Sequence, residues 1–452
     1  MEDVIQYTAG FLLGKDSLPL VSYAKTPSSK KLTIIQSGFF DAGTYGTTGS
    51  LPRTPLATLP ESGIPFLFGE PRLERREDGR LVLHADLVAS AYFMLSRYEE
   101  IIKPDCRDKW GRFLAKDSVV FQQGYGFRPL VDEWGLYLRN LLRTIGTDIP
   151  GEKPGFSKIY LTHDVDEPFK LYNLRSLARQ YALNIMRPKQ YVRHPLRVLV
   201  TGKNDPYFTF QKIITYDEEL RKQVSVSVES VYFIIAARGV QYCDLGLRKF
   251  RNLISLLSSS GARLGLHISH AGGAFPARIK KEMRRLKEYI PDSHGISRHH
   301  YLRWREPGHI SQMQDAGITD DFTLSFADSV GFRVGTCRPY LFMNPVSKEV
   351  TGITVHPMQI MECSLDRLNY MNLGYEQALD VCTRLIDETF RYNGELNLLW
   401  HNTSFQEGHY YEKLYATLLG HISALIRPRH HPDGQVSQSG ATEKVFPVQG
   451  AP

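Results

Sequence analysis

The chain lacks long hydrophobic runs and has few cysteines. No stretch approaches the roughly 18 apolar residues that a membrane-spanning helix needs, so we expect no transmembrane segment. The 452 residues include five cysteines that lie far apart and form no C-x-x-C pair: Cys106, Cys243, Cys337, Cys363 and Cys382. Their odd number and wide spacing argue against a disulfide framework and against a thiolate zinc site.

A strong excess of one charge is also missing. The chain has 55 Lys and Arg residues against 48 Asp and Glu residues, a formal charge of +7. The densest basic stretch, Lys280–Lys287, alternates with apolar positions at helical spacing, which favours a solvated helix face over a nucleic-acid patch. No basic stripe with interleaved aromatic residues is present, so we expect no nucleic-acid partner.

The first residues, Met1–Gln6, have neither the basic nor the apolar region of a secretory signal peptide. Together with the cysteine pattern, this start predicts a cytoplasmic protein. The oligomeric state is not indicated by the sequence.

The length and the 42% hydrophobic content predict two domains with sizeable cores. In residues 1–150, short strands are expected at Ile64–Gly69 and Leu81–Leu83. Helices are expected from Leu87 to Ile101, capped by Asp86, and from Val131 to Leu142. Residues 147–156 contain two prolines and two glycines, which indicates a linker.

After the linker, apolar runs alternate with amphipathic helical patterns. This alternation predicts a parallel sheet covered by helices, either an open α/β fold or a barrel. Residues 171–205, which are basic and aromatic with weak periodicity, are interpreted as an insertion, and residues 428–452 as a disordered tail. The expected strands are Ile159–Leu161, Ser230–Ala236, Leu264–His267, Gly331–Val334, Thr354–Met361 and Leu396–His401. The expected helices are 206–223, 244–259, 276–289, 309–316 and 375–392.

The segment Thr162–Asp166 carries two aspartates one residue apart, directly after the apolar run Ile159–Leu161. Two carboxylates this close are unfavourable unless a cation or a proton relieves them. The segment therefore indicates a metal or acid/base site, and a solvated loop is the alternative.

Histidines and arginines follow the later predicted strands. His267 and His270 stand three residues apart after a buried run, and Ser297–Tyr301 includes His300. Imidazole suits zinc and related divalent ions, although single histidines are often structural. His401 ends the run Leu398–His401, where it could act as a general acid or simply cap a strand edge.

These stretches, in this order, resemble the polysaccharide deacetylase family (NodB homology, carbohydrate esterase family 4) over residues 157–427. The aspartate pair is similar to the branch in which one residue separates the two acids. The resemblance implies an α/β fold: a NodB-type distorted (β/α) barrel, here beside a smaller α+β N-terminal domain over residues 1–150. The stretch Ala85–Glu100 resembles the N-terminal domain that accompanies this branch in bacterial surface-polysaccharide loci. Its function is not implied, and it could simply dock onto the barrel.

The resemblance also implies residue roles. Asp164 matches the catalytic base, Arg333 the arginine that steadies the base, and His401 the general acid. Asp166 and His267 match metal ligands. The family spaces its two motif histidines four apart, and here position 271 is alanine, so His300 is our choice for the third ligand and His270 the alternative.

The implied activity is hydrolysis of an acetyl or similar acyl group from a sugar of a bacterial surface polysaccharide or its precursor. A divalent ion, zinc by preference, would be the cofactor, and an acetylated carbohydrate the substrate. Trp400 and Tyr340 could stack on the sugar ring or belong to the core, and Arg338 is a candidate substrate contact. The altered histidine spacing leaves open a degenerate protein that binds carbohydrate or a biosynthetic partner without catalysis.

Overall fold

The computed structural model describes residues 1–186, 195–202, 204–237, 248–293, 295–406 and 408–427. The predicted disordered tail, residues 428–452, lies outside the described residues. No helix among the described residues combines the length and apolar character that a bilayer crossing requires.

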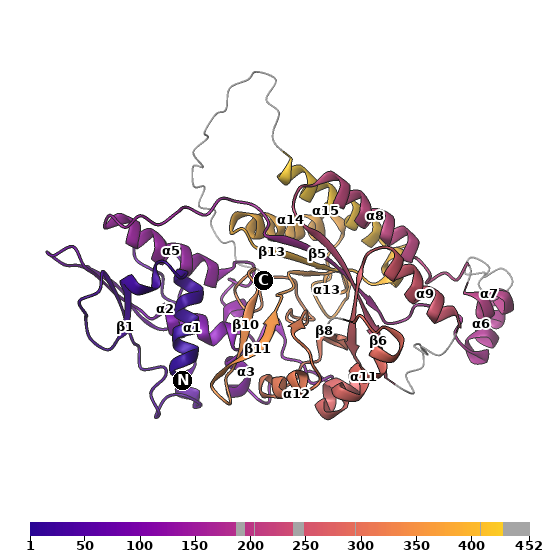
Figure 1. Ribbon diagram of the computed structural model, residues 1–452, viewed down its shortest axis with the longest axis horizontal. Helices are drawn as coiled ribbons and strands as arrows, with labels where there is room; N and C mark the ends of the chain where they lie inside the picture. Colours follow the sequence, from indigo (N-terminus) through magenta and orange to yellow (C-terminus); the bar gives the residue numbers. More distant parts are fainter. Residues whose placement is uncertain (187–194, 203, 238–247, 294, 407, 428–452) are drawn as a thin grey trace, which may run out of the picture.

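The N-terminal part is a small α+β unit (Figure 1). Its four strands are ordered β1-β2-β4-β3, and β3 runs antiparallel to β4 while the other pairs are parallel. The strands are β1 (Val21–Ala24), β2 (Leu32–Ile35), β3 (Gly69–Arg75) and β4 (Leu81–Ala85). The helices are α1 (Glu2–Leu13), α2 (Leu87–Leu95), α3 (Glu99–Ile102), α4 (Val119–Gln122) and α5 (Leu130–Thr144).

The predicted elements of this part are partly confirmed. Asp86 caps α2 as expected, accepting a hydrogen bond from the amide of Ala89. The single helix expected up to Ile101 is instead two helices, because Arg97 adopts a left-handed backbone conformation with φ 57°. The strand expected at Ile64–Gly69 is absent, since that segment makes only one isolated bridge before β3 begins.

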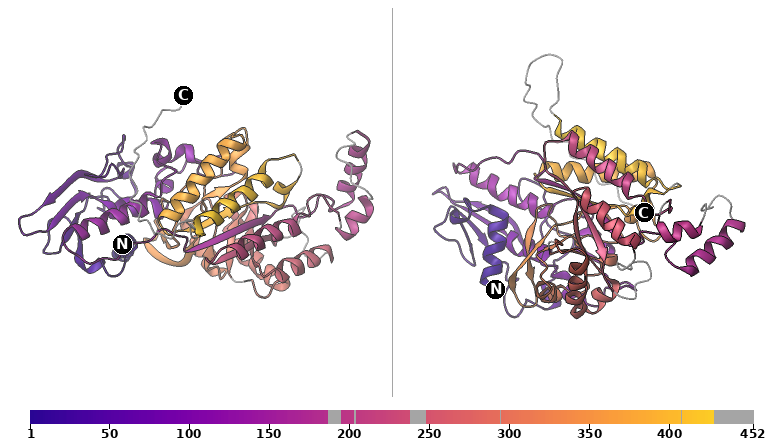
Figure 2. Two further views of the ribbon diagram at one scale, coloured as in Figure 1. Left: turned by 90° about the horizontal axis from the view of Figure 1, so that it is seen from above. Right: turned by 45° about the vertical axis from the view of Figure 1, so that its right-hand side comes forward.

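The larger part is a curled, mixed nine-stranded sheet that forms a half-barrel (Figures 1 and 2). Its order is β10-β11-β9-β8-β7-β6-β5-β13-β12, and only the β10–β11 pair is antiparallel. The predicted α/β class, with a barrel-like sheet beside a smaller α+β unit, is confirmed. The strands are β5 (Lys158–Val165), β6 (Val228–Ile235), β7 (Arg263–Ile268), β8 (Ile296–His299), β9 (Asp320–Asp321), β10 (Tyr340–Asn344), β11 (Glu349–Val355), β12 (Ile360–Met361) and β13 (Glu395–Leu399).

Helices cover the outer face of this sheet. Most expected helices are present with small differences at their ends, although residues 244–247 of the helix expected over 244–259 lie outside the described residues, and α15 was not expected. They are α6 (Leu174–Met186), α7 (Pro195–Thr201), α8 (Phe210–Gln223), α9 (Arg248–Ser259), α10 (His270–Ala274), α11 (Ile279–Tyr289), α12 (Ile310–Asp315), α13 (Cys363–Asp366), α14 (Tyr375–Arg391) and α15 (Tyr411–Ile426).

Two strand predictions after β9 are wrong. Gly331–Val334 forms a turn, in which Gly331 has a φ of 134° and the amide of Phe332 donates to the Gly126 carbonyl. Thr354–Met361 is not one strand, because β11 ends at Val355 and β12 begins only at Ile360. The two-domain division itself stays a prediction, although buried side chains of both parts join one continuous hydrophobic cluster.

Candidate metal centre

Asp164 on β5 and Asp166, directly after its end, point into the half-barrel because alternate residues of an extended chain share a face. Asp164 is 3% exposed. His163, between it and Thr162, faces the other way, where its Nδ1 donates to the Trp400 carbonyl and its Nε2 lies 3.2 Å from Asp217. The histidine of this motif is therefore structural, and the two acids belong to the interior of the sheet.

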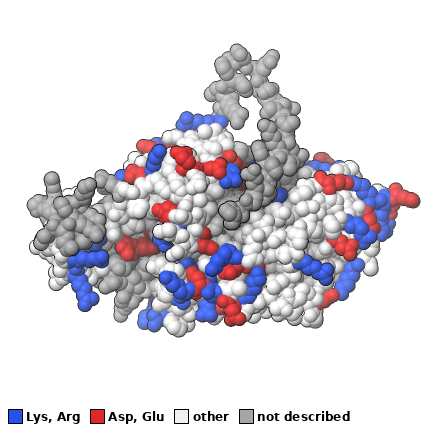
Figure 3. Space-filling view, turned by 180° about the vertical axis from the view of Figure 1, so that it is seen from behind, with Lys and Arg blue, Asp and Glu red and all other residues white. Residues whose placement is uncertain are grey.

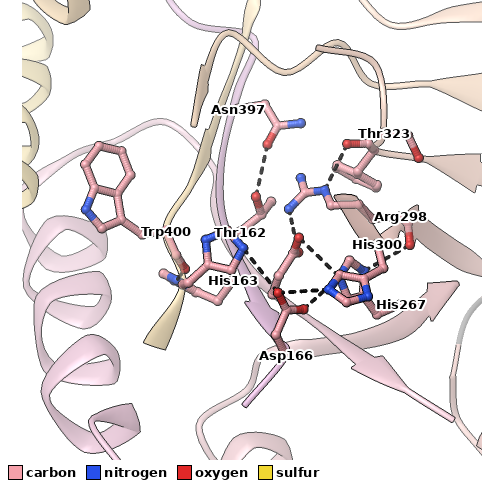
Figure 4. Close-up of polar contacts among 12 residues, drawn as sticks. Thr162, His163, Asp166, His267, Arg298, His300, Thr323, Asn397 and Trp400 are labelled. Atoms are coloured by element: carbon pink, nitrogen blue, oxygen red, sulfur yellow. Dashed lines mark hydrogen bonds and ion pairs between the residues drawn. The ribbon is translucent and has the colours of Figure 1, made fainter. Parts of the chain in front are cut away.

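Asp166, His267 and His300 come together at the ends of β5, β7 and β8 (Figure 4). Nε2 of His267 lies 3.0 Å from Oδ1 of Asp166, and Nε2 of His300 lies 3.3 Å from its Oδ2. Tyr301, directly after His300, has a φ of 61°, a left-handed conformation that is uncommon outside glycine. His270 does not join this group, because it lies beside the Arg303 guanidinium.

The hydrogen bond of His267 fixes which of its nitrogens faces the acids. Nδ1 lies 3.0 Å from the Arg298 carbonyl, which can only accept, so Nδ1 carries a hydrogen. In the neutral ring, Nε2 then presents a lone pair to Asp166 and, at 3.5 Å, to Asp164. A lone pair facing two carboxylates requires a cation between them, either a proton or a metal ion.

The separations fit a divalent ion. Ligands about 2.1 Å from a tetrahedral ion lie about 3.4 Å from one another, close to the 3.0 and 3.3 Å observed. The Arg298 carbonyl, which accepts the hydrogen bond of Nδ1 of His267, is the kind of hydrogen-bond partner that orients metal-binding histidines. Asp166, His267 and His300 therefore form a candidate His/Asp metal-binding triad.

Neighbouring charges favour the ionised form of Asp166 and the charged form of His267. Burial alone would raise the pKa of Asp166, but His300 and His267 outweigh it and hold that pKa well below its usual range. Burial opposes charge on His267 as well, yet Asp164 and Asp166 raise its pKa. The triad thus already behaves as a site that attracts positive charge.

Asp164 is held by Arg298, not by Arg333. Nη1 of Arg298 lies 3.0 Å from Oδ1 of Asp164, and its Nε donates to the Phe322 carbonyl. The guanidinium is fully buried and stacks over the Phe233 ring at 4.5 Å. Asp164 therefore has a rigid cationic partner within the sheet.

Arg333, expected to steady Asp164, lies elsewhere. Its turn directs the guanidinium to the N-terminal part, where Nη2 lies 2.5 Å from Oε1 of Glu100 and Nη1 donates to the Ser325 carbonyl. Glu100 is also bound by Arg97. The acidic end of the Ala85–Glu100 stretch thus docks onto the larger part, the alternative that the sequence had left open.

His401 reaches the same pocket from the end of β13. Its Nε2 lies 3.6 Å from Oδ2 of Asp166, and its Nδ1 lies 2.7 Å from Oε1 of Glu362. Burial disfavours the imidazolium, but Glu362 raises the pKa of His401 well above its usual value, and His401 in turn helps lower that of Glu362. His401 is thereby oriented and kept protonated.

Glu362, Cys363 and His401 form a second group of possible metal ligands within the described residues. Oε1 of Glu362 already accepts hydrogen bonds from the His401 amide, from its Nδ1 and from the Ser404 hydroxyl. Because Nδ1 of His401 is a donor here, it has no lone pair for an ion. This group is a charged hydrogen-bond network.

The three predicted substrate contacts do not reach the pocket. Trp400 is fully buried on the outer face, where its indole donates to the Tyr411 carbonyl (Figure 4). Tyr340 is 2% exposed and donates to the Leu95 carbonyl. Arg338 pairs with Asp132 of α5. All three instead hold the structure together.

A pocket opens over the triad, and the N-terminal part contributes to it. Arg112 lines it, held by Asp108 and donating to the Tyr370 hydroxyl. Arg367 also lines it and makes no ion pair with any acid of the described residues. The lining residues are Arg112, Asp164, Asp166, His300, Tyr301, Leu302, Met361, Cys363, Arg367, Tyr370 and His401.

Sequence reasoning had not assigned roles to Arg298, Glu362, Arg112 or Arg367. Arg298 precedes His299 and His300 in the sequence. Its role would have followed only if Ile296–His299 had been predicted as a strand of the sheet. Glu362 follows the short apolar pair of β12, and nothing in the sequence links Arg112 to the pocket.

Comparisons with known proteins give a family match over the N-terminal part and a distant structural alignment. Residues 9–147 match a family of unknown function (DUF7033). No curated protein matches the chain. A solved structure described as a "putative polysaccharide deacetylase from Mycobacterium smegmatis" aligns with 64% of this chain and 100% of its own, at 11% identity and a TM-score of 0.36. At that score the alignment carries no argument about function.

Proposed function

We propose that this protein is a metal-dependent hydrolase that removes an acetyl or similar acyl group from a carbohydrate. The observation that carries the proposal is the convergence of three arrangements on one pocket. These are a carboxylate held by a buried arginine, a His/Asp triad suited to a divalent ion, and a histidine paired with a buried glutamate.

Asp166, His267 and His300 would hold the ion. A set of two imidazoles and one carboxylate suits zinc, which we propose as the ion. When bound, a divalent ion supplies Lewis-acid chemistry: it polarises an acyl carbonyl and acidifies a water molecule.

Asp164 would accept the proton of the attacking water. Arg298 holds its Oδ1, so Oδ2 remains for that proton, and Oδ2 is the oxygen that faces His267. The buried guanidinium holds the carboxylate in a fixed position, as a general base requires.

His401 would donate a proton to the departing alkoxide or amine. Its Nδ1 is tied to Glu362, so the proton on Nε2 points toward Asp166 and the pocket. Glu362 raises the pKa of His401, which keeps this acid protonated near neutral pH.

Arg112, Arg367 and Tyr370 would contact the sugar. Arg367 offers donors that make no ion pair with any described acid, and Arg112 is the residue of the N-terminal part that lines the pocket. The exposed Tyr301 ring, 43% exposed at the rim, offers a surface for a sugar face in place of Trp400 and Tyr340.

The test is Asp164→Asn in metal-loaded protein, assayed by acetate release from a panel of N- and O-acetylated sugars. We expect turnover to fall at least about 100-fold while metal content is unchanged. Metal retained by the wild type without hydrolysis of any acylated sugar would favour a protein that only binds carbohydrate. Unchanged turnover in Asp164→Asn would remove Asp164 from the mechanism.

A further inference from the structure

Two helices, α6 and α7, project from the body of the protein (Figures 1 and 2). They lie between β5 and α8, and their base is firmly anchored. Nζ of Lys249 donates to the carbonyls of Leu171 and Leu199, and Asp205 accepts the amides of Lys170 and Leu171. The projection is therefore an ordered insertion, which follows β5 and Asp166 in the chain.

The sequence of this insertion, residues 171–205, is strongly basic: it contains seven Lys and Arg residues and one acid, Asp205. Its formal charge of +6 makes up most of the +7 of the whole chain, so the other 417 residues sum to +1. Most of the net positive charge of the sequence thus lies in this insertion, whose described helices α6 and α7 lie at the left edge of Figure 3.

The same helices expose large apolar side chains. Leu174 is 75% exposed, Tyr181 50%, Leu196 56% and Val200 69%. These are four of the ten large hydrophobic residues exposed in the described part of the chain, on helices of 13 and 7 residues. Such clustering on one projection marks an interaction surface.

Apolar and basic residues alternate in stripes. Leu174 and Tyr181 lie seven apart and Leu196 and Val200 four apart, so each pair lies on one side of its helix. Arg175 and Arg179 form a neighbouring exposed stripe on α6, as Arg197 does on α7. None of these three arginines forms an ion pair with an acid among the described residues. Their charge is left for an external partner.

We propose that the α6–α7 pair docks on an anionic lipid surface. Exposed aliphatic and aromatic residues beside arginines are the composition of helices that lie in the membrane interface. A nucleic acid would use the arginines but gain little from Leu174, Leu196 and Val200. A second copy of the chain would bring two basic surfaces together, each carrying Arg175, Arg179 and Arg197. The inference does not depend on hydrolytic activity.

The experiment is co-sedimentation of the full chain with vesicles of phosphatidylcholine alone and of phosphatidylcholine with 30% phosphatidylglycerol. We expect binding to the anionic vesicles only, weakening as salt is raised. Arg175→Glu/Arg179→Glu should lower the partition coefficient at least about 30-fold, from about 1 kcal/mol per basic residue. Leu174→Ser/Leu196→Ser should lower it about tenfold.

The matched control is Lys280→Glu/Arg284→Glu, which reverses two exposed charges four residues apart on α11. It changes net charge equally and should leave binding within about threefold of wild type. The proposal is overturned if wild type ignores anionic vesicles, or if the control weakens binding as much as Arg175→Glu/Arg179→Glu does. It is overturned as well if these arginine changes abolish DNA binding or dimerisation but leave vesicle binding unchanged.

Discussion

Replacing Arg298 tests the reading of Asp164 as a base. Nη1 of Arg298 and Oδ1 of Asp164 are 3.0 Å apart. At an effective dielectric constant of about 20, two unit charges at that separation attract by about 5.5 kcal/mol. Removing one partner of a buried pair costs about 3–5 kcal/mol. We therefore expect Arg298→Gln to lower the free energy of unfolding by that amount.

Activity should fall further than folding alone explains. Without the guanidinium, the buried Asp164 carboxylate loses its fixed position and its counter-charge. The rate enhancement from general-base catalysis, a factor of about 10²–10⁴, should then be lost. The assay is hydrolysis of 4-nitrophenyl acetate by metal-loaded protein, under conditions where circular dichroism shows the variant folded.

Arg298→Lys and Arg333→Gln complete the test. Lysine keeps the charge but cannot also reach the Phe322 carbonyl, so it should recover part of the activity. Arg333→Gln leaves Glu100 bound by Arg97, so it should cost about 2 kcal/mol of stability and change turnover less than about threefold. Wild-type turnover in Arg298→Gln, or an equal loss in Arg333→Gln, would refute the assignment.

Three further results are expected. Glu362→Gln removes the charge that raises the pKa of His401, so the alkaline limb of the kcat–pH profile should move to lower pH; an unmoved limb would contradict the assignment of His401 as the acid. His356 lies between two carboxylates that raise its pKa against the effect of burial, so its stabilisation should be full below about pH 6.5 and be lost as pH rises through the raised value. Urea unfolding should therefore show a larger deficit for His356→Gln at pH 6 than at pH 9, and an equal deficit would count against a charged His356. Arg367→Ala should raise KM for an acylated sugar about tenfold with little change in kcat, whereas an unchanged KM would exclude it as a sugar contact.

Much of the site followed from strand alternation. Asp164 lies on β5 and Asp166 directly after its end, two residues on, so the two acids share a face, and β7 and β13 lead to His267 and His401 at their ends. Alternation could also have placed Trp400 correctly. It neighbours His401 along the chain, so if His401 faces the pocket, Trp400 must face the outer helices.

Other parts were not readable from the sequence. The strand holding Arg298 is Ile-Ser-Arg-His, which is too polar to resemble a buried strand, yet each of its residues is buried. The run Gly331–Val334, apolar except for Arg333, resembles a strand but forms a turn, since Gly331 has a positive φ and Arg333 pairs with Glu100. Arg298 pairs with Asp164 and Arg333 with Glu100, and both partners are far away in the chain. Local sequence patterns do not encode such long-range pairings.

The measurement that tests the central claim most directly is metal analysis of wild type beside Asp166→Ala, His267→Ala, His300→Ala and His270→Ala. His270 is the matched control because it neighbours the triad but pairs with Arg303. We predict close to one divalent ion per chain in wild type and His270→Ala, and loss of the ion in the other three. Absence of metal after soaking, or loss in His270→Ala with retention in His300→Ala, would contradict the proposed centre.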